Sequence, residues 1–514
     1  AAGAPAPGAN PLAFGFYDTP ETPQPVELEI TGTIPSWVHG SLYRGAQAGW
    51  DAGNYTAEHW FDGFSRNHKF EIANGKVTYR SRNSADELHD FVQETGRYPG
   101  SSFAGDPCKV ILGAFQSTFR DGVKSAGNKT SRTVQVSFVK NFPGLDHNST
   151  NFGPLFTLTA TTDSNVMNQI DTVTLEPIEL FTYQATSRDY NDTSLTCAHP
   201  AIGSDGQLFN YVLDVQNGPP TYKIFGINGG KGSVLATITG VPPVYIHTLF
   251  STENYLILNL WQAVLGKTKS GKESYNLVDK IQPWNATQPS LMYVIDKKGG
   301  GVVARYAGPT FFAFHEINTF ESNGDIYMDM PTFDSHDWTL QGLRLAKLRT
   351  VPNENANIDL PSVFTRFKLP NIAGGKAADG TIITQKATID FQMSRKDGNL
   401  EVPRINEKYQ HKDYRYAYGI HLEKPGHFAD SIVKIDIQSK SSKVWLPSTD
   451  HLVSEPVFIP RPGCDDEDDG VLLVTALCAQ SKLSKLVVLD AKTMTEVGRA
   501  GLPVVMGYGF HGLW

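Results

Sequence analysis

Short apolar runs separated by turn-forming residues dominate the pattern along the chain. Residues 134–139, 255–261, 432–437 and 470–477 are examples, and each has the length and β-branched or aromatic character of a strand. Asn-Gly and Asp-Gly pairs follow several runs, as at Asn74-Gly75 and Asn323-Gly324. Long stretches with helical periodicity are missing. The pattern therefore predicts an all-β fold with tight turns between strands.

The number of predicted strands limits the possible architectures. A sandwich of 514 residues would need subdivision, whereas a β-propeller accommodates more strands by adding blades. The chain has no tandem repeat of about 40 residues, so a propeller of the WD type is not predicted. No low-complexity linker interrupts the pattern. We therefore predict one continuous domain over residues 1–514, with an irregular amino-terminal segment over residues 1–25.

The segment of residues 107–119 departs from the strand pattern. Its apolar residues Val110, Ile111, Phe115 and Phe119 recur at mixed three-to-four spacing, which predicts a short amphipathic helix. Two interpretations stay open. The helix packs on the core, or its four apolar side chains form an exposed lip that touches lipid or admits an apolar substrate.

Composition excludes several classes of partner. Hydrophobic residues make up 40% of the chain, and 45 basic against 53 acidic residues give a net charge of −8, which does not favour nucleic acid. No apolar run approaches the roughly 18 residues of a membrane-spanning helix, so we expect no transmembrane segment. Five Asn-x-Ser/Thr sequons, little more than chance supplies, favour a secreted protein slightly over a cytoplasmic or peripheral membrane protein.

Histidines supply the candidate chemistry. Of the 14 histidines, His199, His247, His315 and His511 lie within or beside apolar strand-like stretches. A single histidine of this kind is ordinarily a hydrogen-bonded core residue. Burying several imidazoles is costly unless each has a partner, and a shared metal supplies one partner to all of them. Their spacing matches no local zinc motif, so both interpretations stay open at this level.

Isolated acids strengthen the metal hypothesis. Asp163, Glu401 and Glu455 each lie next to apolar strand residues. A carboxylate commonly fixes the second ring nitrogen of a metal-binding histidine, although each acid alone is more typical of a surface strand. The acidic run of residues 465–469 is different, and we predict that it forms a solvated loop.

Ordered motifs run along nearly the whole chain. They are Ile34-Pro-Ser-Trp-Val-His-Gly-Ser-Leu-Tyr-Arg, His59-Trp-Phe-Asp-Gly-Phe, Gly75-Lys-Val-Thr-Tyr-Arg-Ser-Arg, Asp106-Pro-Cys-Lys, Ala198-His-Pro, Tyr245-Ile-His-Thr, Phe314-His-Glu-Ile-Asn-Thr-Phe-Glu, Tyr416-Ala-Tyr-Gly, Ser454-Glu-Pro-Val-Phe and Phe510-His-Gly-Leu-Trp. Together they resemble the carotenoid cleavage oxygenase family, and they look closest to its branch of β-carotene oxygenases and retinoid isomerohydrolases.

The resemblance implies a seven-bladed β-propeller with a cap of loops and short helices over the active site. It implies one iron(II) per chain on the propeller axis, bound by His199, His247, His315 and His511. The three glutamates that the family places behind its histidines map onto Asp163, Glu401 and Glu455. Asp163 departs from the family pattern. Aspartate is one methylene shorter, so its contact with an imidazole could be longer or pass through water.

The resemblance further implies a non-haem iron dioxygenase with O2 as co-substrate. Its substrate would be an apolar conjugated alkene, either a carotenoid or apocarotenoid or an aromatic alkene such as a stilbene or phenylpropene, cleaved at a C=C bond to two carbonyl products. Thr162 stands where the stilbene-cleaving branch has lysine, which argues against that branch's phenol contact. No catalytic side chain is predicted beyond the metal centre. The alternatives are a retinoid isomerohydrolase-like enzyme and a non-catalytic binding propeller.

Overall fold

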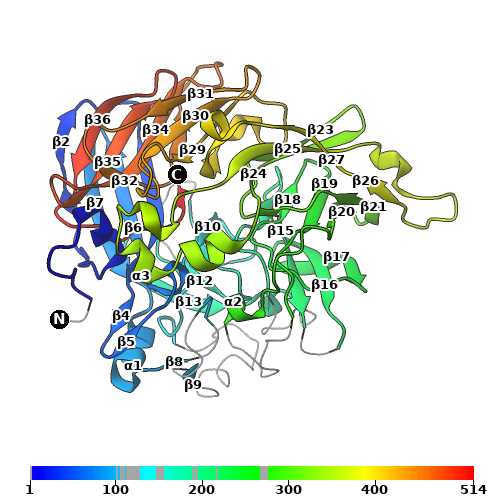
Figure 1. Cartoon of the computed structure of the whole chain (residues 1–514), viewed down its shortest axis with the longest axis horizontal. Coiled ribbons are helices and arrows are strands. Elements are labelled where there is room, and N and C mark those ends of the chain that lie inside the picture. The colour runs from blue at the N-terminus through cyan, green and yellow to red at the C-terminus, as the bar shows by residue number, and fades with distance from the viewer. Residues whose placement is uncertain are drawn as a thin grey trace.

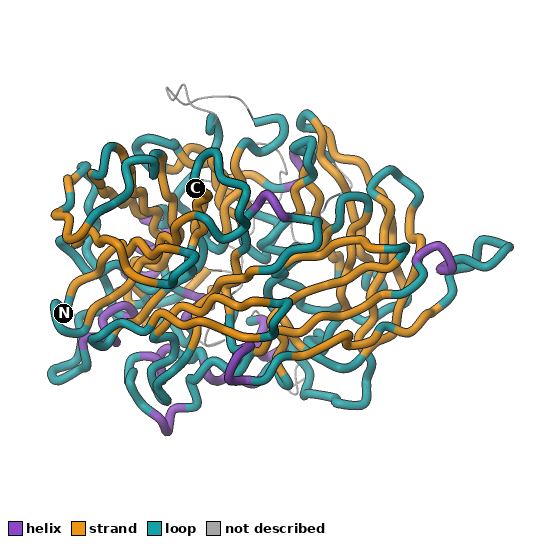
Figure 2. The backbone as a smooth tube through the Cα atoms, turned by 90° about the horizontal axis from the view of Figure 1, so that it is seen from above, coloured by secondary structure: helices purple, strands orange, loops and turns teal. Residues whose placement is uncertain are grey.

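The computed structural model describes residues 3–99, 102–104, 110–111, 128–145, 155–187, 190, 195–215, 218–266 and 276–514, with only the backbone at residues 110–111. Within these residues, strands form seven sheets of four or more strands. The sheets surround a common axis, and helices are few and short (Figures 1 and 2). The fold is a seven-bladed β-propeller, which confirms the predicted class.

The seven sheets are called blades 1 to 7 in chain order. Blade 1 contains β1 (Val26–Glu27), β7 (Lys76–Asn83), β6 (Phe64–Ala73), β3 (Gly40–Gly49) and β37 (Gly512–Leu513). Blade 2 contains β10 (Ser137–Lys140), β11 (Leu158–Thr161), β12 (Met167–Ile170) and β13 (Pro177–Phe181). Blade 3 contains β14 (Ala201–Ile202), β15 (Leu208–Asp214), β16 (Thr221–Asn228) and β17 (Lys231–Thr239).

The remaining blades follow in the same direction along the chain. Blade 4 contains β18 (Phe250–Ser251), β19 (Tyr255–Leu260), β20 (Ser290–Asp296), β21 (Gly301–Gly308) and β26 (Thr384–Lys386). Blade 5 contains β22 (Phe312–Ala313), β23 (Asn318–Ser322), β24 (Asp325–Phe333), β25 (Val363–Leu369) and β27 (Thr388–Gln392). Blade 6 contains β28 (Glu401–Arg404), β29 (Tyr416–His421), β30 (Ser431–Asp436) and β31 (Ser441–Trp445). Blade 7 contains β2 (Glu29–Gly32), β36 (Thr495–Gly501), β35 (Leu483–Asp490), β34 (Gly470–Cys478), β32 (His451–Val453) and β33 (Val457–Pro460).

Local sequence explains the strands and their turns. All nine residues of β34 are buried, as expected of a continuous apolar strand in the middle of a blade. Asn74 and Gly75 have φ angles of +53° and +75° and join β6 to β7. Asn323 and Gly324 do the same between β23 and β24, with φ angles of +53° and +81°. Both Asn-Gly pairs adopt the left-handed geometry of two-residue hairpins, which Asn and Gly tolerate best.

Strands from opposite ends of the chain close the ring. β2 pairs with β36 in blade 7, with Glu29 opposite Gly501, and β37 pairs with β3 in blade 1, with Tyr43 opposite Leu513. Early (blue) and late (red) strands accordingly lie side by side in Figure 1. The propeller therefore cannot close until residues from both ends are in place.

Short helices lie in the loops that connect the strands. They are α1 (Asp86–Thr95), α2 (Leu277–Lys280), α3 (Leu345–Leu348) and α4 (Arg395–Gly398), together with short 3-10 or π-helical segments that include η1 (Pro11–Phe16), η2 (Trp60–Asp62) and η5 (Trp338–Gly342). None of the helices in the described part of the chain has the length and hydropathy of a membrane span. Over residues 3–25 the chain has no strand, and η1 buries Leu12 and Phe16.

The predicted helix over residues 107–119 is wrong where it can be checked. Val110 and Ile111 form strand β9 (Val110–Ile111), which pairs in parallel with β8 (Tyr98–Pro99). Adjacent β-branched residues favour an extended backbone, and pairing with β8 outweighed the weak helical spacing. Phe115 and Phe119 lie outside the described residues. A role of these four residues in a substrate entrance or membrane contact stays a prediction.

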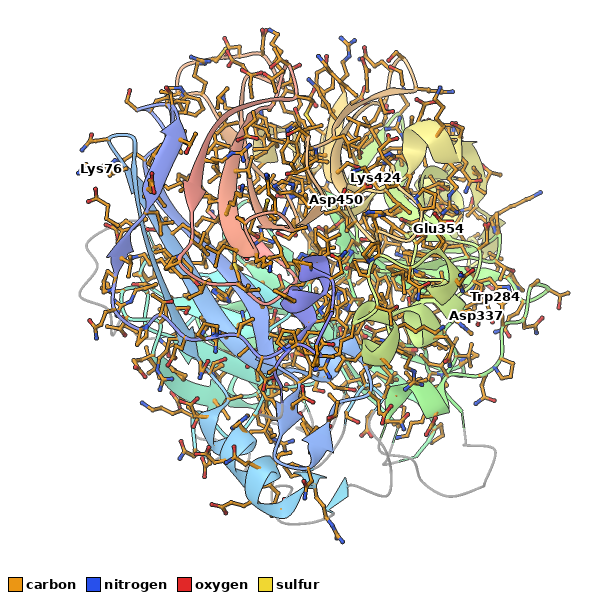
Figure 3. The ribbon with its side chains drawn as sticks, turned by 60° about the vertical axis from the view of Figure 1, so that its left-hand side comes forward. Lys76, Trp284, Asp337, Glu354, Lys424 and Asp450 are labelled. Carbon is orange, nitrogen blue, oxygen red and sulfur yellow. The ribbon has the colours of Figure 1, made fainter. Side chains whose placement is uncertain are left out.

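The acidic run of residues 465–469 is a loop, as its sequence predicts, but only part of it is solvated: Asp465 and Asp466 are exposed, whereas Asp468 is buried. Asp468 forms a 2.6 Å ion pair with Lys434, and the two side chains are 10% and 7% exposed. Glu467 accepts hydrogen bonds from the backbone N–H groups of Arg415 and Tyr416. The loop therefore ties blade 7 to blade 6. Charged side chains of the outer surface, such as Lys76 and Glu354, are exposed instead (Figure 3).

Breaking the buried pair should destabilise the propeller. We expect Asp468→Asn to lower the free energy of unfolding by about 3 kcal/mol, because it leaves the Lys434 ammonium buried without a counter-charge. Asp466→Asn is a matched control, since Asp466 pairs with Lys492 at 2.9 Å where both side chains are more than half exposed. It should cost less than about 1 kcal/mol. Denaturant unfolding of both variants measures the difference, and equal losses would contradict the assignment.

Candidate metal centre

Four histidines converge on the propeller axis. His199, His247, His315 and His511 each offer one ring nitrogen, and these atoms all lie within 4.8 Å of one another. The Nε2 atoms of His315 and His511 are 3.1 Å apart, and the ring centroids of His199 and His511 are 4.4 Å apart. The four rings therefore surround a common point.

Blade ends place these histidines. His199 and His247 come just before β14 and β18, His315 comes just after β22, and His511 immediately precedes β37. Backbone bonds fix neighbouring segments directly, since His199 N donates to His247 O at 3.2 Å and Leu249 N donates to His199 O at 3.2 Å. Because the histidines meet, these ends of blades 3, 4, 5 and 1 face the axis.

Carboxylates hold three of the four rings from behind. His247 Nδ1 lies 2.9 Å from Asp163 Oδ1, and His315 Nδ1 lies 2.6 Å from Glu401 Oε2. His511 Nδ1 bonds Glu455 Oε2. A carboxylate on Nδ1 fixes the tautomer that carries its proton there, which leaves the Nε2 lone pair free to face the other rings.

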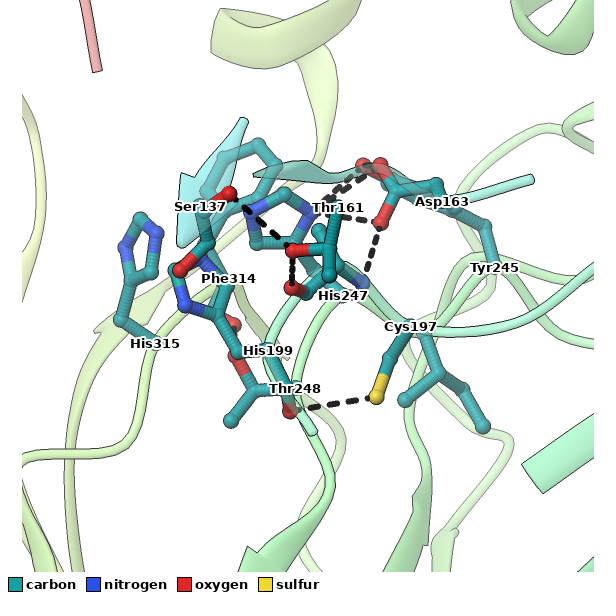
Figure 4. A network of polar contacts seen from close by, with 12 residues as sticks. Ser137, Thr161, Asp163, Cys197, His199, Tyr245, His247, Thr248, Phe314 and His315 are labelled. Carbon is teal, nitrogen blue, oxygen red and sulfur yellow. Dashed lines mark hydrogen bonds and ion pairs between the residues drawn. The ribbon is translucent and has the colours of Figure 1, made fainter. Parts of the chain in front are cut away.

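Asp163 contacts His247 directly despite its shorter side chain. Two further groups hold the carboxylate: Tyr245 donates its hydroxyl to Oδ2 at 2.8 Å, and Ala198 N donates to Oδ1 at 3.1 Å (Figure 4). Thr196 N also donates to the Asp163 carbonyl at 2.9 Å. The chain therefore brings the backbone of residue 163 close enough to replace the missing methylene, and no bridging water is needed.

Arginines surround the third carboxylate. Arg404 Nη2 lies 2.7 Å from Glu455 Oε1, and Arg44 Nη1 donates to the Glu455 carbonyl at 2.9 Å. Burial alone would raise the pKa of the Glu455 carboxyl, but the charges of Arg404 and Arg44 and the hydrogen bond from His511 hold that pKa well below its usual range. Burial lowers the pKa of His511 to about 3, so its imidazole is neutral at pH 7.

The donor set fits a divalent metal. Among the described residues, His199 Nε2 is buried without any hydrogen-bond partner, and burial holds the pKa of His199 well below its usual value. An orphaned imidazole lone pair beside three others is costly unless a cation accepts it. Neutral imidazoles suit iron, zinc, copper and nickel, so the ligand set alone does not select iron. The cluster is compatible with a metal site, and ligation by these four residues stays a prediction.

An aromatic wall borders the histidines on one side. The Phe314 ring is 5.4 Å from the His247 ring and 6.2 Å from Phe61. Phe61 in turn lies 4.9 Å from Phe103 and 5.6 Å from Phe510. Phe61 and Phe103 are only partly buried. The wall can therefore contact an apolar, conjugated molecule beside the four histidines.

Short helices and loops support this wall from outside. His59 Nε2 donates to Thr339 O at 2.7 Å, and Trp60 N, in η2, donates to Leu343 O at 3.1 Å. Leu345 N, in α3, donates to Glu58 O at 3.0 Å. η2, η5 and α3 thus form a bonded cap next to Phe61, as the resemblance implies.

Sequence reasoning missed several residues that the structure places at the site. Tyr245 precedes His247 by two residues, and the same-face rule for strands could have identified it. Phe61 lies in the motif His59-Trp-Phe-Asp-Gly-Phe, but the sequence alone assigns it no role at the site. Arg44 and Arg404 come from distant segments, and nothing in the sequence pairs them with Glu455. The predicted acids and histidines, in contrast, are all brought together.

Comparisons with known proteins agree with this geometry. Residues 16–514 match the family model described as "Retinal pigment epithelial membrane protein" (RPE65). A carotenoid dioxygenase of Neurospora crassa is 32% identical over 98% of this chain and 90% of that protein. The mitochondrial carotenoid-cleaving dioxygenase of Homo sapiens is 30% identical over 96% of this chain and 88% of that protein. The cobalt-substituted apocarotenoid oxygenase of Synechocystis has a TM-score of 0.72 at 20% identity, covering 98% of each chain, which shows a shared fold.

Acid should destabilise the fold partly through His59. Burial lowers the pKa of His59 from 6.5 to about 3, and Phe61 N donates to its Nδ1 at 3.2 Å. Because the unfolded chain binds this proton below pH 6.5 and the folded chain does not, stability falls as pH drops from about 6.5 towards 3. His59→Gln should reduce that loss by about 1.4 kcal/mol per pH unit. Unfolding measured between pH 7 and 4 tests this, with the exposed His39→Gln as control.

The Asp163 contact should control metal affinity. Asp163→Asn lets an amide N–H donate to His247 Nδ1, which moves the ring proton to Nε2 and blocks the lone pair. We expect about a tenfold loss in affinity for a divalent metal. Asp171→Asn, in a turn of the same blade where Asp171 accepts from Val173 N and Thr174 N, is the matched control. Metal titration of both variants checks this, and equal affinities would refute a positioning role for Asp163.

Proposed function

We propose that this chain, which belongs to the RPE65/carotenoid oxygenase family and is an oxygenase, cleaves a conjugated C=C bond of an apolar alkene with iron(II) and O2. A carotenoid or apocarotenoid is the favoured substrate, and two carbonyl fragments are the products. The observation that carries the proposal is the convergence of four histidine nitrogens within 4.8 Å, beside an aromatic wall.

His199, His247, His315 and His511 would hold the iron. Bound iron(II) would supply the one-electron chemistry that dioxygen requires before it reacts with an alkene. The chain's own contribution is orientation: Asp163, Glu401 and Glu455 keep three Nε2 lone pairs directed inwards. Four neutral ligands add no negative charge, so the three carboxylates offset a divalent cation from the far side of the rings.

The aromatic wall would position the substrate. Phe61, Phe103, Phe314 and Phe510 present ring faces and edges against which a polyene can stack, within about 6 Å of His247 or of one another. Holding one double bond in place beside the metal would lower the entropy cost of bringing the alkene and dioxygen together in a reactive geometry. The position of the polyene along this wall would then decide which bond breaks.

Acid–base groups contribute little in this proposal. The three carboxylates around the site are all bonded to histidines, and Cys197 donates its thiol to Asn210 Oδ1 at 2.9 Å. Burial raises the pKa of Tyr245 well above its usual value, so its phenol stays protonated and bound to Asp163. Selection of the scissile bond therefore rests on positioning.

The relatives support a polyene substrate. The proteins of Neurospora crassa and Homo sapiens that match nearly the whole chain carry the names carotenoid dioxygenase and carotenoid-cleaving dioxygenase. Thr162, next to Asp163, cannot supply the lysine contact of the stilbene-cleaving branch. An aryl alkene remains the second substrate class to test.

Incubation under ¹⁸O2 tests the proposal. The iron-loaded protein is offered a panel of carotenoids, apocarotenoids and aryl alkenes, and we expect ¹⁸O-labelled carbonyl fragments from a polyene. His247→Ala should lose bound iron and the products together, whereas the exposed His39→Ala should keep both. A retinoid ester is offered alongside the panel, and its isomerisation and hydrolysis without label would favour the isomerohydrolase alternative over cleavage. Full activity in the His247→Ala variant would refute the site.

A further inference from the structure

One short strand, β28, contributes to two of the three carboxylate–histidine contacts. Glu401, its first residue, accepts from His315 Nδ1 at 2.6 Å. Arg404, its last residue, donates Nη2 to Glu455 Oε1 at 2.7 Å, and Glu455 binds His511. In a regular strand, residues three apart face opposite sides of the sheet. Two contacts directed at the same centre therefore require a departure from regular geometry.

A β-bulge supplies that departure. Glu401 lies opposite Ile420 whereas Arg404 lies opposite Tyr418, so three steps along β28 match two steps along β29. Between them, Val402 has a φ of +42°, a conformation that is costly for a β-branched residue. Val402 N donates back to Glu401 Oε2. Bulges beside active sites commonly redirect a side chain, and this one turns Arg404 towards the Glu455 carboxylate.

The partner strand is adapted to the bulge at Gly419. A Cβ atom added to Gly419 would lie 2.7 Å from the Glu401 carbonyl oxygen and 3.2 Å from Leu400 Cβ. Any larger residue would push β29 away from the bulge. This close approach gives a physical role to the glycine of the Tyr416-Ala-Tyr-Gly motif, which the proposed chemistry does not use.

Arg404 connects Glu455 to the backbone that follows His511. Its Nη2 also donates to the Gly512 carbonyl, while Gly512 N donates to Glu455 Oε1 at 2.9 Å. Glu455 is 1% exposed, so water cannot replace these contacts. Within the described part of the chain, Asp163 and Glu401 have no ion pair with arginine or lysine, whereas Glu455 has one.

We propose that Arg404 is a positioning residue of the metal centre. Presented by the bulge at Val402, it holds the Glu455 carboxylate and the Gly512 peptide in the places that direct His511 Nε2 at the shared metal. This inference rests on the proposed metal site and assigns to it an outer residue that acts through Glu455.

Cobalt titration of the metal-free protein tests the proposal. Co(II) binding is followed by its visible absorption, which reports both affinity and coordination geometry. We expect Arg404→Gln to weaken Co(II) binding by about tenfold and to change the band shape. Arg404→Lys should restore part of the affinity, because a single nitrogen makes both contacts. Arg415→Gln is the matched control: Arg415 pairs with Asp436 at 2.7 Å on blade 6, away from the histidines, and its loss should change neither quantity.

A double variant separates positioning from general destabilisation. Arg404→Gln combined with Glu455→Gln leaves no unpaired buried carboxylate, so it should fold even if Arg404→Gln alone does not. If Arg404 acts through Glu455, the double variant should bind Co(II) as weakly as Glu455→Gln alone. A further tenfold loss in the double variant, or unchanged affinity and spectrum in Arg404→Gln, would overturn the inference. Failure of the unaltered protein to bind Co(II) would instead refute the metal site itself.

Discussion

One residue from each of the seven blades converges on the histidine centre, and this convergence constrains how all the blades pack. Blades 1 to 7 contribute, in order, His511, Asp163, His199, His247, His315, Glu401 and Glu455. No two of these residues share a blade, so their distances depend on how the blades pack around the axis. A change in the tilt of any blade moves one of the four histidines or one of the three carboxylates behind them. The rigid packing of the apolar blades is therefore part of the chemistry of the centre.

The three carboxylates are stabilised in three different ways. Asp163 is held by a neutral phenol and a backbone N–H, Glu401 by an N–H of its own strand, and Glu455 by a guanidinium. Arg404 thus compensates one of the three negative charges behind the rings. Arg44, which donates to the Glu455 carbonyl, brings a second positive charge to the same place, so ion pairs and hydrogen bonds together let these carboxylates share a largely buried site.

Local pattern predicted the strands well, because burial within a blade and turn chemistry both act over a few residues. The Asn74-Gly75 hairpin and the apolar strand β34 are examples. Apolar surroundings distinguished the four distant histidines, but their assignment to one metal centre came from the resemblance, since ring closure leaves no trace in local spacing. Arg404 could not be predicted, because its direction depends on a left-handed Val402, a conformation that valine rarely adopts. The helix predicted at Val110 and Ile111 was wrong because pairing with β8 outweighed a weak helical period.

The pairing of β37 with β3 also sets an order of events during synthesis. The strand that follows His511 bonds to one near the start of the chain, so a nascent polypeptide on the ribosome holds only three of the four imidazoles until β37 has emerged. A cation that requires all four imidazoles could then bind only after the ring has closed. A prematurely terminated product would lack both the pairing of β37 with β3 and the fourth imidazole of the cluster.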